Sequence, residues 1–116
     1  GLPLVINGDG RQGRDFIYVD DVVRAFVLAG FESMPGAEKI FNVSSGKMVS
    51  IKQIVKQVCR LHKNTKVEFL TDKKNVEISY CCDPSKFFGK YSWRPRVSLS
   101  KGIEQALSYY RGRKIT

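Results

Sequence analysis

Hydrophobic and polar residues along this chain follow strand spacing in some stretches and helical spacing in others. Short apolar or alternating runs predict strands at Leu2–Ile6, Phe16–Val19, Lys39–Val43, Lys66–Leu70 and Val76–Tyr80. Clusters of turn-forming residues at Asn7–Gly13 and Met34–Gly36 separate some of these runs. The chain therefore combines predicted strands with the helical segments described next.

Apolar residues that recur every three or four positions predict helices. The first begins at Asp20 or Asp21, either of which could cap it, and runs through Leu28 to Gly30 near its end. Ser50 followed by Gln53 forms a capping box that opens a second helix. A short helix follows Asp83-Pro84 as far as Phe88, and a last helix, capped by Ser98 or Ser100, extends to Tyr110. The predicted fold class is mixed α/β, without the regular strand–helix alternation of a complete doubly wound sheet.

The run GDGRQG at residues 8–13 matches the spelling G-x-G-x-x-G of dinucleotide-binding loops. That spelling is meaningful when the loop follows a strand and opens a helix, because the helix N-terminus then faces the pyrophosphate. Here the third glycine opens a predicted strand, and the helix follows some eight residues later. We expect no helix N-terminus to face this loop and interpret it as a turn, not an NAD site.

Composition indicates one globular domain over residues 1–116 that attracts anions. Lys and Arg number 20 against 11 Asp and Glu, a net charge of +9. Such an excess favours nucleic acid, acidic lipid or a phosphorylated small molecule as partner, or serves only as a solvated face. Three cysteines and a single histidine, His62, favour neither a disulfide framework nor a metal site, so we expect a reduced, cytoplasmic protein.

Residue chemistry alone does not indicate an autonomous active site. The chain has no G-x-S-x-G, no H-E-x-x-H and no Walker loop. No apolar run approaches the roughly 20 residues of a membrane span. The first residue is glycine and not methionine, from which we expect a piece of a longer protein. The pattern thus predicts a basic α/β module that binds an anion.

Three segments, in order, resemble the C-terminal part of the extended short-chain dehydrogenase family, which contains the NAD-dependent nucleotide-sugar epimerases and 4,6-dehydratases. Residues 2–28, LPLVINGDGRQGRDFIYVDDVVRAFVL, are similar to the family's G-D-G-x-Q-x-R-D-F-[IV]-Y-V-D-D-V stretch. Residues 41–55, FNVSSGKMVSIKQIV, resemble its N-[VIL]-G-x-G segment. Residues 83–107, DPSKFFGKYSWRPRVSLSKGIEQAL, resemble its D-x-S-K…L-G-W-x-P segment. Together these segments span nearly the whole chain.

The resemblance implies that NAD and the catalytic Tyr-x-x-x-Lys pair belong to an N-terminal portion outside this chain. We therefore expect the chain to lack both, to be inactive alone and to hold the diphosphate of a nucleotide sugar. It implies backbone contacts to the base from the strand at Val5, Ile6 and Asn7, and a diphosphate contact from Arg14. Guanidinium forms bidentate bonds to phosphate oxygens, which suits this role. The alternative for Arg14 is a salt bridge with Asp9 or Asp15.

Several departures from the family pattern affect the expected site. Lys73 stands where the family has a second phosphate arginine, and is the other expected diphosphate contact. Ser44 replaces the first glycine of the N-[VIL]-G-x-G segment, which predicts strain if that position needs a positive φ. Tyr91-Ser92-Trp93 replaces L-G-W. These differences leave the base, the sugar and the reaction undecided.

Two other classes of function remain open. A nucleic-acid module would be equally basic, but it should carry exposed aromatic residues among its cations on one strand face. A protein-interaction module predicts an exposed apolar patch. We expect no nucleic-acid or membrane partner, and we expect apolar faces around Ile17 and Phe41 to be covered either by a second copy or by the family's N-terminal domain.

Overall fold

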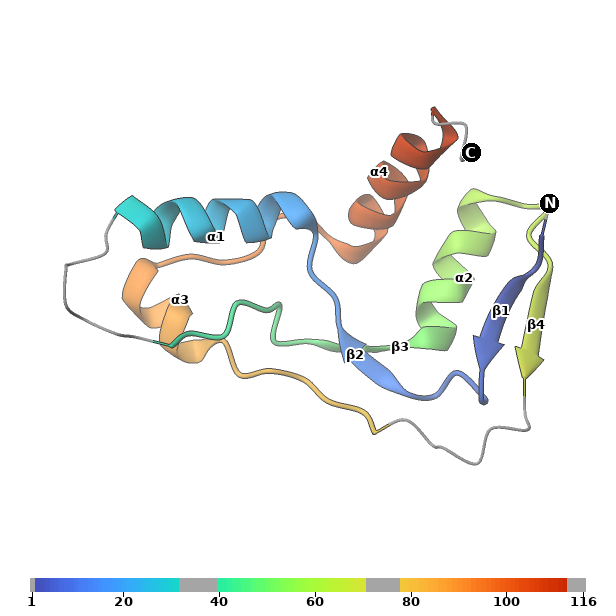
Figure 1. Cartoon of the computed structure of the whole chain (residues 1–116), viewed down its shortest axis with the longest axis horizontal. Helices are drawn as coiled ribbons and strands as arrows, with labels where there is room; N and C mark the ends of the chain where they lie inside the picture. Colours follow the sequence, from blue (N-terminus) through green and yellow to red (C-terminus); the bar gives the residue numbers. More distant parts are fainter. Residues whose placement is uncertain (1, 32–39, 71–77, 113–116) are drawn as a thin grey trace.

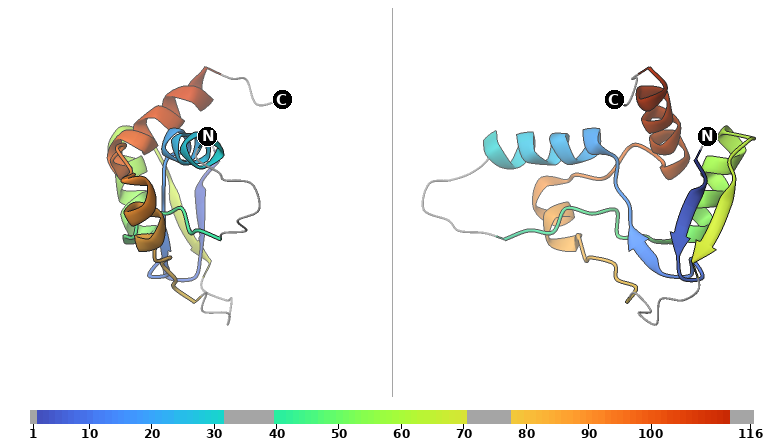
Figure 2. Two further views of the ribbon diagram at one scale, coloured as in Figure 1. Left: turned by 90° about the vertical axis from the view of Figure 1, so that its left-hand side faces the viewer. Right: turned by 45° about the vertical axis from the view of Figure 1, so that its right-hand side comes forward.

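The molecule is elongated. The computed structural model describes residues 2–31, 40–70 and 78–112. Its extents are 50 × 36 × 25 Å, and its radius of gyration of 17.2 Å exceeds the roughly 13 Å of a compact domain of this length (Figure 1). A lobe built on helices α1 (Val19–Phe31) and α3 (Ser85–Tyr91) lies at one end (Figure 2). The other end holds a small sheet and helix α2 (Ile51–Leu61).

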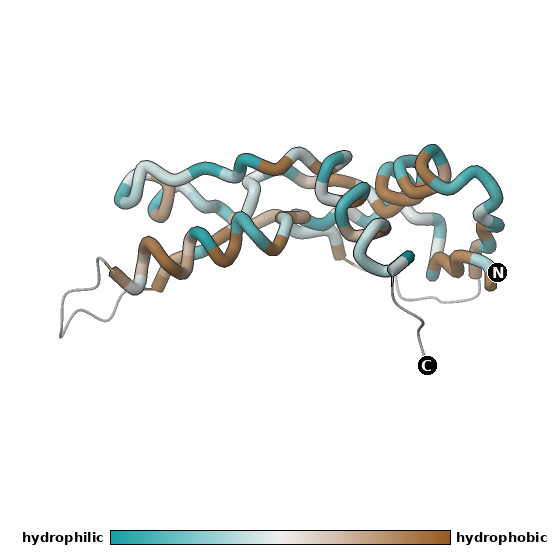
Figure 3. The backbone as a smooth tube through the Cα atoms, turned by 90° about the horizontal axis from the view of Figure 1, so that it is seen from above, coloured by the Kyte–Doolittle hydropathy of each residue, from teal (hydrophilic) through white to brown (hydrophobic). Residues whose placement is uncertain are grey.

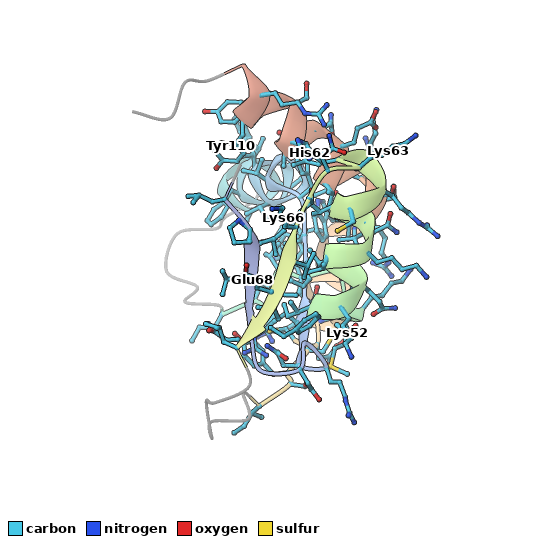
Figure 4. All side chains as sticks on the ribbon, turned by 90° about the vertical axis from the view of Figure 1, so that its right-hand side faces the viewer. Lys52, His62, Lys63, Lys66, Glu68 and Tyr110 are labelled. Atoms are coloured by element: carbon cyan, nitrogen blue, oxygen red, sulfur yellow. The ribbon has the colours of Figure 1, made fainter. Side chains whose placement is uncertain are left out.

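The sheet at that end joins segments that are far apart in the sequence. Strand β1 (Leu4–Asn7) pairs in parallel with β4 (Val67–Leu70), with Ile6 opposite Phe69. Helix α2 covers one face of the pair (Figure 4). Ile6 and Val55 are buried there, at 2% and 9% exposed, so this lobe has a small core of its own.

A second pair of strands connects the two lobes. Strand β2 (Gly13–Asp15) runs antiparallel to β3 (Met48–Ser50), with Arg14 opposite Val49. The last residue of β3, Ser50, is the N-cap of α2. Its hydroxyl accepts a hydrogen bond from the Gln53 amide, and the Gln53 side chain accepts one from the Ser50 amide. The predicted capping box is confirmed, and it fixes where β3 ends and α2 begins.

The core of the other lobe is aromatic. Ala25, Phe87 and Trp93 are at most 2% exposed. The rings of Phe87 and Trp93 meet edge-to-face with centroids 5.4 Å apart. Phe41 packs against Phe87 in the same way at 5.7 Å. Rings in this arrangement stabilise each other by more than the burial of their area alone. Residues from α1, α3 and the segment before β3 thus form one cluster.

Two predicted strands are wrong because their apolar side chains serve this cluster. Residues 16–18 form an irregular connection, and α1 already begins at Val19. Residues 40–43 are also irregular, and Lys39 lies outside the described residues. Ile17, Phe41 and Val43 pack against the aromatic core instead of forming a ladder. Of the run at 76–80, only Ile78–Tyr80 is described, and it is not a strand, although the Tyr80 amide donates to the Gly13 carbonyl at 3.4 Å.

The helix ends agree with the sequence in part. Ser98 caps α4 (Leu99–Arg111), its hydroxyl accepting from the Lys101 amide, so this alternative is confirmed over Ser100. Asp83 accepts from the Ser85 amide, and α3 runs three residues beyond the predicted end at Phe88. Neither Asp20 nor Asp21 caps α1, because the helix starts before both of them.

Backbone strain falls at a different position from the one expected. Among the described residues other than glycine, Ser92 alone has a positive φ, at 48°, so Ser44 does not. Ser92 is the left-handed residue that ends α3, a position that favours glycine because a Cβ is crowded there. It stands in place of the glycine of the L-G-W pattern, so the departure at Ser92 carries the strain and the one at Ser44 does not.

One face of α1 is apolar and uncovered. Hydrophobic residues recur along this helix (Figure 3). The exposed ones, with exposures from 50% to 89%, are Val19, Val23, Phe26, Val27 and Phe31. Their spacing places them along one stripe. The sequence predicts the apolar surface around Ile17 and Phe41, but those residues are partly buried in the aromatic core. Within the described ranges, no helix is long and apolar enough to cross a membrane.

Candidate functional site

The glycine loop between β1 and β2 rests on the start of α2. The Lys52 amide donates to the Gly10 carbonyl at 2.9 Å, and the Ile51 amide donates to the Gln12 carbonyl at 3.1 Å. A helix N-terminus therefore does face this loop, contrary to the expectation from the sequence. The helix belongs to a segment nearly 40 residues further along the chain, so local sequence could not reveal it. Its first amides are bonded to carbonyls of the loop.

The amides of the loop also have partners within the chain. The Gly8 amide donates to Leu70 O at 2.9 Å, and the Arg11 amide to the Asp9 carboxylate at 2.9 Å. The Gly13 amide donates to the Ser79 hydroxyl at 2.7 Å. Gly8 and Gly10 have φ values of +74° and +71°, which other residues rarely adopt. These glycines shape a tight turn between two strands.

Strand β1 has an uncovered edge that carries backbone groups of two candidate residues. The amides of Leu4 and Gly8 donate to carbonyls on the β4 side. Successive residues of a strand direct their amides and carbonyls to opposite edges, so those of Val5 and Asn7 are directed away from β4. No described strand pairs along that edge. The Asn7 carbonyl accepts from the Gln12 side chain at 2.9 Å.

Ile6 differs from its two neighbours in the candidate set. Its side chain is buried, and by the same alternation its backbone faces β4. The structure thus brings Val5 and Asn7 to the uncovered edge and places Ile6 in the core under α2.

Arg14 is held in one place by several contacts. Its guanidinium donates to the Gly13 carbonyl at 2.9 Å and to the Ile78 carbonyl at 2.8 Å. It also lies 4.5 Å from the centroid of the Tyr80 ring, a cation–π distance. Of the two carboxylates considered as partners, Asp9 pairs with Arg11 at 2.7 Å, and Asp15 accepts from the amides of Ser45 and Gly46. The stacking on Tyr80 fixes the guanidinium beside β2, and no pattern in the sequence predicted it.

Asp15 anchors the segment that follows the Phe41–Val43 run. Its carboxylate accepts from the amides of Ser45 and Gly46, each at 2.9 Å, and from the Ser45 hydroxyl at 2.6 Å. Burial raises the pKa of Asp15, but these hydrogen bonds outweigh it and the pKa lies below its usual value. Cys81 donates to the same carboxylate at 3.3 Å. Desolvation and that bond raise the pKa of the Cys81 thiol.

Two lysines are candidates for a second cation beside Arg14. Lys73 lies outside the described residues, so nothing places it. Lys52 was not considered from the sequence, yet it lies at the start of α2, beside the end of the strand pair (Figure 4). A Cβ built on Gly10 would be 3.1 Å from Lys52 Cγ, so this lysine lies against the glycine loop. His62 and Lys63 lie at the opposite end of α2 (Figure 4).

Comparison with known proteins identifies the family. The sequence model of the NAD dependent epimerase/dehydratase family matches residues 1–44. The human dTDP-D-glucose 4,6-dehydratase is 31% identical over 114 residues, which cover 91% of this chain and 32% of that protein. The UDP-glucuronate 4-epimerase of Thermodesulfobacterium geofontis is 34% identical over 110 residues, covering 92% of this chain and 33% of that protein.

Solved structures agree with the sequence relatives. The UDP-glucose 4-epimerase of Thermotoga maritima, solved with UDP-glucose, superposes with a TM-score of 0.81 at 31% identity, covering 95% of this chain and 35% of that one. The UDP-glucuronic acid 4-epimerase of Bacillus cereus, solved with UDP-glucuronic acid and NAD, gives a TM-score of 0.83 at 30% identity, with the same coverage. The chain belongs to the NAD-dependent epimerase/dehydratase family.

This epimerase/dehydratase-family chain spans about a third of the length of the relatives it matches. Its fold is the corresponding part of the Rossmann-type epimerases, so the predicted family and fold class are confirmed. The elongated shape of the molecule is consistent with its being similar to only part of these longer proteins. The strands and helices superpose on the corresponding part of a chain about three times as long.

The expectation that the chain lacks a Tyr-x-x-x-Lys spacing is wrong. The chain does contain a Tyr-x-x-x-Lys spacing, because Lys114 follows Tyr110 by four residues. Tyr110 is 59% exposed near the end of α4, and Lys114 lies outside the described residues. The pair follows the third family-like segment, whereas the family's pair belongs to the N-terminal portion. We therefore assign it no catalytic role.

The described part of the chain brings no three metal-ligating side chains together. Cys59, Cys81 and Cys82 are free thiols. The candidate residues supply two cations, Arg14 and Lys52, and the backbone donors and acceptors of the uncovered edge of β1.

Proposed function

We propose that this chain is the substrate-binding portion of a nucleotide-sugar epimerase or 4,6-dehydratase and forms one domain over residues 1–116. It binds the nucleoside diphosphate and is inactive alone. The observation that carries this proposal is Arg14, which stacking on Tyr80 and two carbonyl contacts hold beside β2. A guanidinium held in advance loses less conformational freedom when it binds phosphate oxygens. Lys73 is proposed as a second cation.

In this proposal the base lies along the uncovered edge of β1. The amides and carbonyls of Val5 and Asn7 point to that edge, where a base could exchange hydrogen bonds with them. Ile6 contributes by packing beneath the strand. Lys52 joins the set as a cation close to the glycine loop. In the family, the NAD(P) of the parent enzyme is held by the N-terminal portion, so the proposal assigns no cofactor to this chain alone.

A titration followed by amide NMR shifts tests the proposal. UDP should shift the signals of Val5, Asn7 and Arg14, and uridine should bind at least about tenfold more weakly, because a charge-assisted contact contributes about 1.5–3 kcal/mol. NAD should show no saturable binding in the micromolar range. Equal affinity for uridine and UDP, or UDP shifts confined to residues remote from β1 and β2, would contradict the proposal.

We further propose that the apolar stripe on α1 associates with a second copy or with the family's N-terminal domain. The isolated chain should self-associate as its concentration rises, because the five apolar side chains of the stripe are at least half exposed. Replacing Phe26 by Lys should weaken this association, and replacing the exposed Lys56 of α2 by Ala should not. Sedimentation velocity measures the effect; a strictly monomeric wild type at high concentration would refute the expectation.

A further inference from the structure

A cavity lies at the junction of the two lobes, and neither Arg14 nor Tyr80 is among the described residues that line it. It has a volume of about 600 Å³ and lies between the β2–α1 connection, the segment before β3 and the segment between α3 and α4. Its apolar wall includes Phe16, Val49 and Phe88. A volume of this size is within the range of small-molecule sites. A smaller apolar cavity of about 180 Å³ adjoins it under Phe16 and Leu99.

The cations of this cavity have no opposing charge in its walls. Lys47, Arg94 and Arg96 line it, and the described residues of the lining include no carboxylate. Lys47, Arg94 and Arg96 are exposed, and cations next to an apolar surface without an opposing charge in the lining attract an anion. The combination favours a ligand that is both charged and apolar.

Two carboxylates that are not part of the lining form hydrogen bonds to the backbone of the cavity walls. Asp15 holds Ser45 and Gly46 on one side. On the other side Asp21, which is 2% exposed, accepts from the amides of Arg96 at 3.0 Å and Val97 at 2.9 Å. Both carboxylates thus fix the backbone of the cavity walls by accepting from its amides.

Arg94 links the charged and apolar parts of the lining. Its guanidinium lies 4.0 Å from the centroid of the Phe88 ring and donates to the Trp93 carbonyl at 2.8 Å. An anion bound to the other edge of this guanidinium would place its apolar body against Phe88 and Phe16. We propose that this cavity is a binding site for a small organic anion, a phosphate or carboxylate on an aromatic or aliphatic body, separate from the diphosphate site at Arg14.

The probe for this site is 1-naphthyl phosphate, compared with 1-naphthol and with inorganic phosphate in NMR titrations of the full chain. The ester should shift the amide signals of Val49, Phe88 and Val97 and should bind at least about tenfold more tightly than either comparison compound. Replacing both Lys47 and Arg96 by Ala should weaken the ester about tenfold or more. Arg94 is left in place because it packs on Phe88.

Two control variants make the outcome decisive. Lys56→Ala removes an exposed cation of α2 outside the cavity, and Arg14→Ala removes the proposed diphosphate contact; both should leave naphthyl phosphate binding unchanged. The site is refuted if 1-naphthol binds as tightly as its phosphate, if Lys56→Ala weakens binding as much as the double variant, or if the shifts map to the α1 stripe. Loss of binding in Arg14→Ala would refute a separate site. Failure here leaves the UDP result untouched, so the two proposals fail independently.

Discussion

Replacing Asp21 by Ala should destabilise the chain by about 3–5 kcal/mol, the largest effect we expect from one substitution. Asp21 is 2% exposed and bonds the amides of Arg96 and Val97, 75 and 76 residues away. It also pairs with the partly buried Arg24 of the same helix. Removing the carboxylate leaves two amides without their acceptor and breaks the ion pair of Arg24, which keeps its bond to the Arg94 carbonyl, and unsatisfied buried groups are costly.

Urea unfolding followed by tryptophan fluorescence measures this loss. The only tryptophan, Trp93, is 2% exposed in the core, close to the segment that Asp21 holds. Asp20→Ala is the matched control, because Asp20 is the neighbouring carboxylate and is exposed. Equal stability of the two variants, within about 0.5 kcal/mol, would show that Asp21 does not hold the junction.

The contribution of Asp21 should depend on pH. Burial raises the pKa of Asp21, but the hydrogen bonds from the Arg96 and Val97 amides and the nearby Arg24 outweigh it, so the pKa lies below 3.8. A carboxyl with a lowered pKa stabilises the fold fully above its unfolded value and progressively less as the pH falls through the folded value. The stability difference between wild type and Asp21→Asn should thus be constant near neutral pH and shrink below about pH 4.

Local signals in the sequence predicted the helices well. The capping box at Ser50 and Gln53 and the cap at Ser98 act within one helical turn, so their geometry does not depend on the rest of the chain. The runs at Phe16–Val19 and Lys39–Val43 failed because β-branched and aromatic residues suit strands and aromatic cores alike. Only the position of Trp93 and Phe87, far along the chain, decides between these.

The site was predictable only through the family motifs. The motif indicated Arg14, but its ring contact with Tyr80 lies 66 residues away. No local pattern in the sequence indicates Lys52, because it contacts the glycine loop from α2, which lies far along the chain. Ile6 is grouped with the wrong neighbours for a different reason. Chain position groups it with Val5 and Asn7, while the strand alternation directs it to the core.

Replacing Arg14 by Ala should weaken UDP binding about ten- to a hundredfold, the second large effect. In the proposed site the substitution would remove one charge-assisted contact to a diphosphate oxygen, about 1.5–3 kcal/mol. Arg14→Lys should recover part of the affinity, because lysine keeps the charge but not the planar fork. Arg11→Ala is the matched control. Arg11 lies in the glycine loop just before β2, carries the same charge as Arg14, and its side chain is 82% exposed in its pair with Asp9.

The affinity of UDP for wild type, Arg14→Ala and Arg11→Ala, measured by NMR titration at one ionic strength, tests the central claim most directly. Screening affects both variants equally, so a generic basic surface would lose the same affinity in each. A site built on Arg14 predicts a loss of tenfold or more in Arg14→Ala and less than about twofold in Arg11→Ala. Unchanged UDP affinity in Arg14→Ala, or equal losses in both variants, would contradict the account.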